Sequence, residues 1–224
     1  MDYSDGQTMS LSDTDAYKGT RARRYAEHHR KSLRTRLTTA REQQVLYSSL
    51  ADAGFPETAL DLPCGTGRFW PAFSRAGVKQ LIAGDGSRGM LEVAETHRLN
   101  DMIPAQLLQT SAFEMALPDE SVDFAACLRF YHHLSRPEDR ATLLAELKRV
   151  SRRFVAISLW VDGNLAGNRR IRKPAPDAVA GYGKRICRRR RDVEAEFDAA
   201  GLAVIRHYDI WPRIAMWRLY LLEA

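Results

Sequence analysis

Short apolar runs alternate with amphipathic segments over most of this chain of 224 residues. The apolar runs predict strands over 58–62, 80–84, 105–109, 123–128 and 153–160. Helical periodicity between them predicts helices over 68–76, 87–99 and 137–150. A further helix is expected over 188–200, followed by strands over 202–209 and 214–222. The pattern predicts an α/β fold with a doubly wound, mostly parallel, seven-stranded sheet.

The first 54 residues precede this alternation. Residues 1–20 are polar and acidic, which predicts a flexible N-terminal tail. Residues 21–54 predict a helical arm of two helices with a break near Thr35 to Thr39. Residues 21–224 are long enough for one well-buried domain and too short for two large ones.

Basic residues gather late in the chain. Residues 161–191 hold ten basic and two acidic residues, so a chain with a formal charge of +6 has a net charge of −2 elsewhere. This stretch is also polar and rich in Gly, Pro and Arg, which predicts a basic lid insertion without regular structure. Such placement indicates a local anion site rather than a generally basic protein.

Composition excludes several classes of protein. No apolar run approaches the roughly 20 residues of a membrane span, and the opening residues lack the features of a secretory signal. A cytoplasmic protein is therefore expected. The three cysteines have no paired short spacing, so we expect free thiols, no disulfide framework and no metal site.

A glycine turn is the most informative motif. The apolar run ending at Asp61 leads into Gly65 and Gly67, and Asp85 lies twenty residues beyond Gly65 at the end of the next run. Glycines let a ligand approach bare backbone, and an acidic side chain on the neighbouring strand can accept hydrogen bonds from ribose hydroxyls. A dinucleotide fingerprint would continue to a third glycine, where this chain has Trp70. The motif thus indicates a nucleotide-type ligand other than a dinucleotide, or merely a tight turn between strand and helix.

Three ordered segments carry a family resemblance: Asp61 to Gly67, Leu81 to Ser87, and Leu117 to Phe124. From about Ala59 to Arg149 the chain resembles the class I S-adenosylmethionine-dependent methyltransferases of the type 11 group. The resemblance implies a Rossmann-like methyltransferase fold whose late strands close the sheet with an antiparallel edge. It also implies S-adenosylmethionine as the cofactor.

The resemblance assigns parts of the cofactor to particular residues. Asp61 would hold the amino end, Asp85 would accept the ribose hydroxyls, and Ser111 would stand where relatives carry an acid for the adenine amino group. Phe113 either stacks on the base or packs in the core. The expected cofactor-binding set is Asp61, Pro63, Gly65, Gly67, Asp85, Gly86, Met90, Ser111, Ala112, Leu128 and Arg129.

Two adjacent histidines follow the fourth strand, on the reaction side of the sheet. His132 and His133 are candidates for a general base, which is needed only if the acceptor must lose a proton. Packing against the next helix is the competing interpretation. Arg129 is expected to bind either the cofactor carboxylate or an anionic acceptor.

The run from Arg185 to Arg191 leads into a predicted helix. Positive charge at a helix amino terminus opposes the macrodipole, so the run indicates an anionic partner or else a solvated basic face. The expected substrate-binding residues are Tyr25, Tyr182, Arg185, Arg188 and Arg189.

Together these features predict an enzyme, a methyltransferase that acts on an oxygen or nitrogen of an anionic small molecule or phosphorylated glycan. An RNA methyltransferase is an alternative, because clustered arginine can neutralise backbone phosphates. A non-catalytic partner subunit that retains the methyltransferase fold is another.

Overall fold

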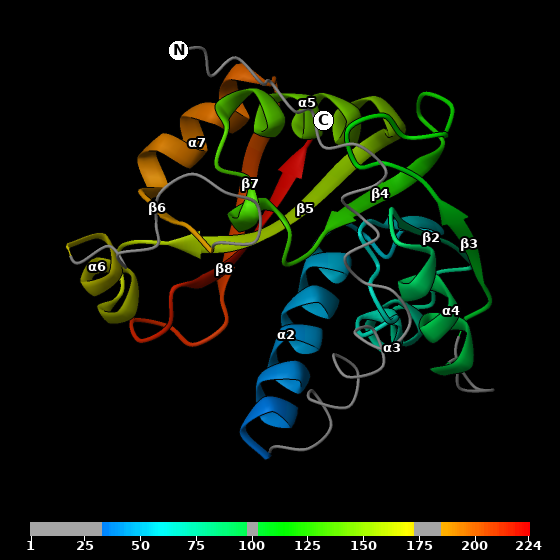
Figure 1. Cartoon of the computed structure of the whole chain (residues 1–224), viewed down its shortest axis with the longest axis horizontal. Coiled ribbons are helices and arrows are strands. Elements are labelled where there is room, and N and C mark those ends of the chain that lie inside the picture. The colour runs from blue at the N-terminus through cyan, green and yellow to red at the C-terminus, as the bar shows by residue number, and fades with distance from the viewer. Residues whose placement is uncertain (1–32, 98–102, 173–184) are drawn as a thin grey trace, which may run out of the picture.

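A computed structural model describes residues 33–97, 103–172 and 185–224 (Figure 1). Its strands are β1 (Thr58–Asp61), β2 (Gln80–Asp85), β3 (Ala105–Gln109), β4 (Val122–Cys127), β5 (Ser151–Val161), β6 (Cys187–Arg188), β7 (Ala203–Asp209) and β8 (Trp217–Glu223). Its helices are α2 (Leu33–Asp52), α3 (Trp70–Arg75), α4 (Arg88–His97), α5 (Pro137–Val150), α6 (Leu165–Arg172) and α7 (Arg190–Ala199), with a 3-10 turn at Tyr131–His133.

The strands form one sheet in the order β3-β2-β1-β4-β5-β8-β7, and β6 pairs with β5 beside this path. Strands β1 to β5 are mutually parallel, and β8 runs antiparallel to both β5 and β7. The predicted mostly parallel, Rossmann-like sheet with an antiparallel strand near one edge is confirmed. The two-residue strand β6 was not predicted.

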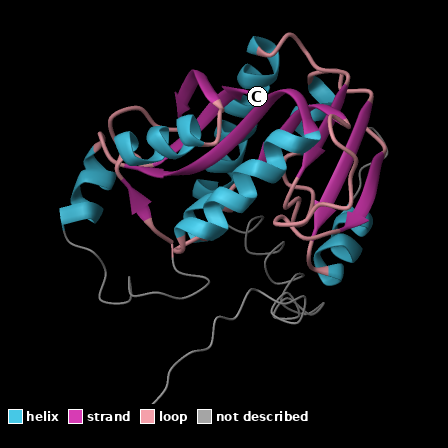
Figure 2. Ribbon diagram, turned by 90° about the horizontal axis from the view of Figure 1, so that it is seen from above, coloured by secondary structure: helices cyan, strands magenta, loops and turns pink. Residues whose placement is uncertain are grey.

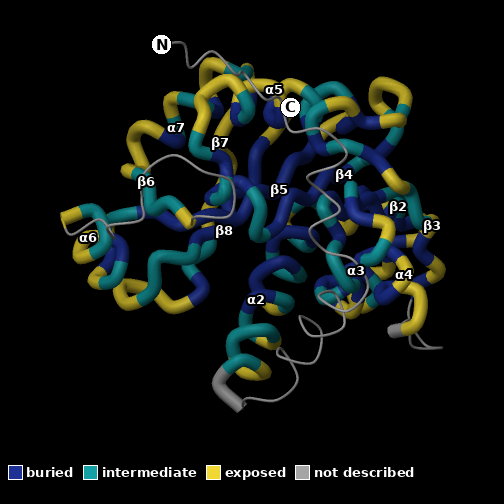
Figure 3. The backbone as a smooth tube through the Cα atoms, viewed as in Figure 1, coloured by how far each residue is buried: buried dark blue, intermediate teal, exposed yellow. Residues whose placement is uncertain are grey.

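Helices cover both faces of the sheet (Figure 2). One apolar cluster packs α2, α3 and α4 against one face, with Leu46, Trp70 and Phe73 fully buried. The other packs α5 and α7 against the opposite face, with Leu143 and Phe197 fully buried. Figure 3 shows the central strands β4 and β5 as the buried centre of the molecule, whereas the edge strand β7 is mostly exposed. Burying one such large apolar side chain stabilises the fold by about 1.5–3 kcal/mol.

The helical arm differs from its prediction. From Leu33 to Asp52 it is one continuous helix, so the predicted break near Thr35 to Thr39 is wrong. The Thr39 hydroxyl donates a hydrogen bond to the carbonyl oxygen of Thr35 at 2.9 Å, four residues earlier, so the threonines are accommodated inside the helix. Residues 21–32 lie outside the described part of the chain.

The segment 161–191 also differs from its prediction. Helix α6 and strand β6 lie within it, so the expectation of no regular structure is wrong for those residues. Asn164 begins α6 by accepting the Gly167 N–H at 2.7 Å, and β6 forms because β5 continues far enough to pair with it. Residues 173–184 lie outside the described part of the chain.

No helix within the described ranges is both long enough and apolar enough to cross a membrane.

Candidate functional site

The glycine turn leaves the carboxyl end of β1 and enters α3. The Cys64 N–H donates to the Gly84 carbonyl oxygen at 2.8 Å, which ties the turn to β2. Gly65 and Gly67 both have positive φ, 56° and 75°, a backbone conformation that favours glycine. A Cβ on Gly65 would meet no atom within 4 Å, so the backbone there faces open space. A Cβ on Gly67 would lie 2.9 Å from the Trp70 ring. The turn therefore offers bare backbone at Gly65 and close packing at Gly67.

Asp61 is a buried carboxylate without a partner. It is fully buried, and neither carboxylate oxygen has a hydrogen-bond partner within the described ranges. Burial raises the pKa of Asp61 to about 8. The nearby Trp70 indole, whose N–H lies outside hydrogen-bond geometry, lowers this pKa, whereas the charge of the neighbouring Asp85 raises it. An unpaired buried carboxyl is costly unless something compensates it. A ligand ammonium group is a suitable partner, which fits the amino end of S-adenosylmethionine.

Asp85 ends β2 beside the glycine turn. Its two carboxylate oxygens accept the N–H groups of Gly65 at 2.9 Å and Ser87 at 2.8 Å. Burial raises its pKa, and these two hydrogen bonds oppose the rise. Each oxygen keeps a second lone pair, so Asp85 can still accept from two ribose hydroxyls. Because the Gly65 N–H is engaged, contacts from Gly65 to a ligand are left to its Cα and its carbonyl oxygen.

The expected adenine side lies beyond β2 and β3. Met90 and Ala112 are buried, and the Gly86 carbonyl oxygen accepts from the Gln109 side chain at 3.4 Å. The Ser111 hydroxyl accepts the Phe113 N–H at 3.1 Å and retains its own O–H donor and a lone pair.

Phe113 is partly buried and lies 6.1 Å from the Phe130 ring, which supports packing in the core. Pro63 follows a cis peptide bond in the turn, and Leu128 is buried at the end of β4.

Arg129 follows β4 with a φ of 60°, unusual for a residue with a side chain. Its Nη1 donates to Glu42 of α2 at 2.7 Å, and its guanidinium lies 4.6 Å from the centre of the Trp217 ring. Glu42 also pairs with Arg68, at the start of the turn into α3. Sequence reasoning missed Glu42, because nothing in its helical segment distinguishes it from the neighbouring charged residues, although it is buried in the structure.

The two histidines lie in unlike surroundings. His132 is 1% exposed, stacks on Trp160 at 5.2 Å and meets the edge of Trp217 at 4.8 Å. His133 is partly exposed, 4.2 Å from His132 between ring centres. Neither Nδ1 has a hydrogen-bond partner among the described residues, and the same holds for the indole nitrogen of Trp160.

Both histidines are neutral at pH 7. Burial lowers the pKa of His132 to about 2, with further lowering from His133 and from nearby arginines. Burial and the charges of Arg185 and Arg129 lower the pKa of His133 to about 4. Each imidazole can therefore accept a proton, although the product would be an imidazolium beside two cations.

The predicted substrate-binding residues do not gather at one site. Arg185 lies 5.6 Å above the Trp160 ring, beside the histidines, and the Ile186 N–H donates to the His132 carbonyl oxygen at 2.8 Å. Arg188 is instead engaged inside the fold, at 2.8 Å from Glu196. Arg189 is exposed at the start of α7. Tyr25 and Tyr182 lie outside the described part of the chain.

Glu196 of α7 is a shared acceptor. It also accepts from the Tyr131 hydroxyl at 2.7 Å and from Arg140 at 2.9 Å. This network explains Arg188 structurally and was not found from the sequence, because its members are far apart along the chain.

The thiols are as expected. Cys64 and Cys127 are buried and Cys187 is partly buried, and all three are free. Burial raises the pKa of each, so none is activated as a nucleophile.

Comparison with known proteins adds a family match. The sequence model of a family described as a methyltransferase domain matches residues 60–154, which hold the glycine turn, Asp85 and both histidines. No curated protein sequence matches the chain.

Solved structures share the fold. The magnesium protoporphyrin IX methyltransferase of Synechocystis, solved with S-adenosylhomocysteine, is 16% identical with a TM-score of 0.70, over 95% of this chain and 97% of that chain. The 1,6-didemethyltoxoflavin-N1-methyltransferase of Burkholderia thailandensis is 15% identical with a TM-score of 0.62, over 98% and 92%. A putative methyltransferase of Haloferax volcanii, in complex with the activator Trm112, is 17% identical with a TM-score of 0.66, over 96% and 97%.

Proposed function

We propose that this chain, whose residues 60–154 match a methyltransferase-domain family and whose fold is shared with S-adenosylmethionine-dependent methyltransferases, transfers the methyl group of S-adenosylmethionine to an oxygen or nitrogen of an anionic acceptor. The bound cofactor supplies a methyl group activated by the positive charge on sulfur. The residues of this chain bind that cofactor, orient the acceptor and exclude water.

Residues at the ends of β1 and β2 fit the cofactor. The unpaired Asp61 carboxylate would take the ammonium group, the Asp85 carboxylate the ribose hydroxyls, and the bare backbone at Gly65 would allow close approach. Met90 and Ser111 would flank the base.

One observation carries the proposal of an anionic acceptor. Arg185 and Arg129 lie against the two tryptophans of the cluster in which His132 packs. Arg129 shares the single carboxylate of Glu42 with Arg68, so positive charge remains at the reaction edge, where the cofactor adds a further positive charge. An anionic acceptor would offset this charge. It would also raise the pKa of His133 and so ease proton transfer.

His133 is the better candidate for the base. His132 is almost fully buried between two tryptophans, whereas His133 is partly exposed. We therefore assign His132 a packing role. His133 would act as the general base in any reaction whose acceptor must lose a proton.

The ion pairs of the arginines in residues 185–191 favour a small acceptor over RNA. Arg188 is paired with Glu196 and Arg190 with Asp162, so fewer cations are free for a phosphate backbone than the sequence alone implies.

Mass spectrometry tests the proposal. Cell extract is incubated with the protein and cofactor carrying an isotopically labelled methyl group, and a product that gains one labelled methyl group is sought. An anionic product, lost with His133→Gln and retained with an exposed control such as Glu57→Gln, would support the proposal. A labelled neutral or cationic product would contradict the anionic acceptor.

A further inference from the structure

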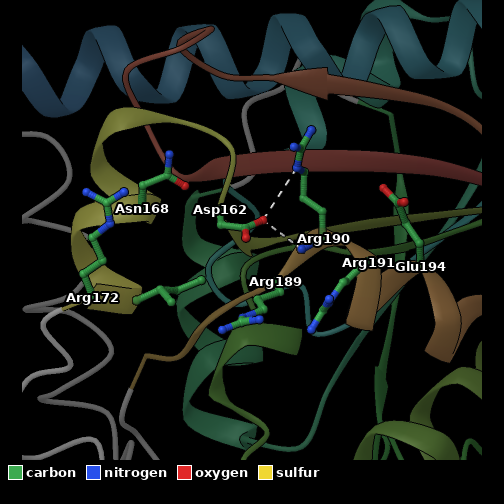
Figure 4. A pocket seen from close by; sticks show the side chains of 8 residues that line it. Asp162, Asn168, Arg172, Arg189, Arg190, Arg191 and Glu194 are labelled. Atoms are coloured by element: carbon green, nitrogen blue, oxygen red, sulfur yellow. Dashed lines mark hydrogen bonds and ion pairs between the residues drawn. The ribbon is translucent and has the colours of Figure 1, made fainter.

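A large cleft lies between α6 and the start of α7, beyond the carboxyl end of β5 (Figure 4). Its volume is about 710 Å³, within the usual range for small-molecule sites. Eight residues line it: Asp162, Asn168, Ile171, Arg172, Arg189, Arg190, Arg191 and Glu194.

Hydrogen bonds fix the walls of the cleft. Asp162 accepts the Arg190 N–H at 2.9 Å, which joins the end of β5 to the start of α7. Asn168 accepts the Gly163 N–H at 2.9 Å, which joins α6 to the same turn. The Arg190 side chain packs on Gly163, where a Cβ would lie 2.5 Å from the guanidinium. The two helices are thus held on opposite sides of the cleft.

The positive charge in the cleft is only partly compensated. Four arginines line the cleft with two carboxylates, Asp162, which pairs with Arg190, and Glu194, which accepts the Tyr220 hydroxyl at 3.0 Å. The guanidinium groups of Arg172 and Arg189 have no ion pair or hydrogen bond to any residue of the described ranges. Figure 4 shows Arg189 at the start of α7 and Arg172 across the cleft on α6. The amino terminus of α7 adds further positive potential.

Strand β6 connects this cleft to the methyl-transfer edge. It pairs Trp160 with Cys187 and Val161 with Arg188, between Arg185 above Trp160 and Arg189 in the cleft. At about 3.3 Å per extended residue, the Cα atoms of Arg185 and Arg189 lie at most about 13 Å apart. A ligand lying along β6 could reach both.

We propose that the cleft binds a phosphate group of the methyl acceptor, at the far end of β6 from the methyl-transfer edge. The two unpaired guanidinium groups match the two charges of a phosphate monoester, and one guanidinium can donate two parallel hydrogen bonds to phosphate oxygens. The acceptor is then an elongated phosphorylated molecule, of the size of a phosphorylated disaccharide or a nucleotide. This inference rests on the proposed function.

The binding test uses the full chain and inorganic pyrophosphate as the probe. Isothermal titration compares the wild type with the double variant Arg172→Gln, Arg189→Gln, and with Arg169→Gln, an exposed residue of α6 that does not line the cleft. The double variant should bind pyrophosphate about tenfold more weakly or worse, and the control as well as the wild type. Equal affinity in all three proteins, or no binding by the wild type, would overturn the proposal.

Two further measurements separate this proposal from the function on which it rests. S-adenosylhomocysteine should bind equally to all three proteins, because the cleft is outside the cofactor site; failure of the wild type to bind it would count against the methyltransferase assignment instead. Phosphatase treatment of the cell extract should abolish the labelled product. A product that forms equally after that treatment would overturn the assignment of the acceptor's phosphate to the cleft.

Discussion

Glu42 of α2 accepts a hydrogen bond at 2.7 Å from Arg129, 87 residues later in the chain at the end of β4. The same carboxylate, only 5% exposed, also pairs with Arg68 beside the glycine turn. One helix preceding the sheet therefore fixes side chains at the ends of two neighbouring strands, β1 and β4.

Replacing Glu42 by Gln should destabilise the protein. Two largely buried guanidinium groups would lose their counter-charge, so we expect the free energy of unfolding to fall by about 2–4 kcal/mol. Urea denaturation measures the change. The control is Glu57→Gln, whose ion pair with Lys79 is 67% exposed on both sides and should contribute less than about 1 kcal/mol. Similar losses in the two variants would show that the buried network is unimportant.

Cofactor binding should release a proton at neutral pH. Burial raises the pKa of Asp61 to about 8, so the group is mostly protonated at pH 7 without a partner. An ammonium group beside it favours the carboxylate and lowers the pKa, so binding of S-adenosylhomocysteine should release up to about one proton and tighten as pH rises towards 8.

Calorimetry in buffers of different ionisation enthalpy counts that proton. Asp61→Asn removes the titrating group and should abolish the release. A wild-type protein that binds without any exchange of protons would disprove the pairing of Asp61 with the amino end.

Asp85 gives the sharpest test of the cofactor position. Asp85→Ala removes the acceptor proposed for two ribose hydroxyls, and affinity for S-adenosylhomocysteine should fall about 100-fold. Asp123→Asn is a matched control, because Asp123 binds Thr58 at the opposite end of the parallel strands. Its affinity should stay within a few-fold of the wild type. Undiminished binding by Asp85→Ala would refute the ribose assignment.

The histidines should make stability depend on pH. The folded-state pKa of His133 is lowered to about 4 from 6.5, so the unfolded chain takes up the proton first as pH falls. The stability is complete above about pH 6.5 and declines between 6.5 and 4. Unfolding in urea at several pH values should show a smaller decline in His133→Gln than in the wild type. Parallel curves would mean that His133 is not shielded from water in the folded protein.

The sequence revealed most of the sheet, because buried strands and amphipathic helices differ strongly in period. Strand 105–109 and helix 137–150 were predicted with the bounds that the structure has. A break was predicted near Thr35 to Thr39, and the Thr39 hydroxyl instead donates a hydrogen bond back to the helix. Strand β6 is too short for any periodic signal, and it depends on the length of β5.

The candidate site was only partly predictable, because some of its residues belong to a local motif and others come from distant parts of the chain. Asp61, Gly65 and Asp85 occur in a local motif, so sequence spacing is enough to group them. Glu42 and Trp217 reach the same region from opposite ends of the chain, and only the folded structure brings them to Arg129. Arg188 was assigned to the acceptor because it belongs to a basic run, whereas its partner Glu196 lies eight residues later, in the second turn of α7.

The packing of α2 against the sheet limits how short a fragment of the chain can be and still fold. The family match begins at residue 60, but Leu46 and Leu50 of α2 are fully buried against the sheet. Asp52 of α2 also forms an ion pair at 3.0 Å with Arg206 of the edge strand β7. An expression fragment cut to the matched region would expose an apolar face of the sheet to water. It would also leave Arg68 and Arg129 without the counter-charge of Glu42. The minimal autonomous unit must therefore include residues from Leu33 to the end of β8.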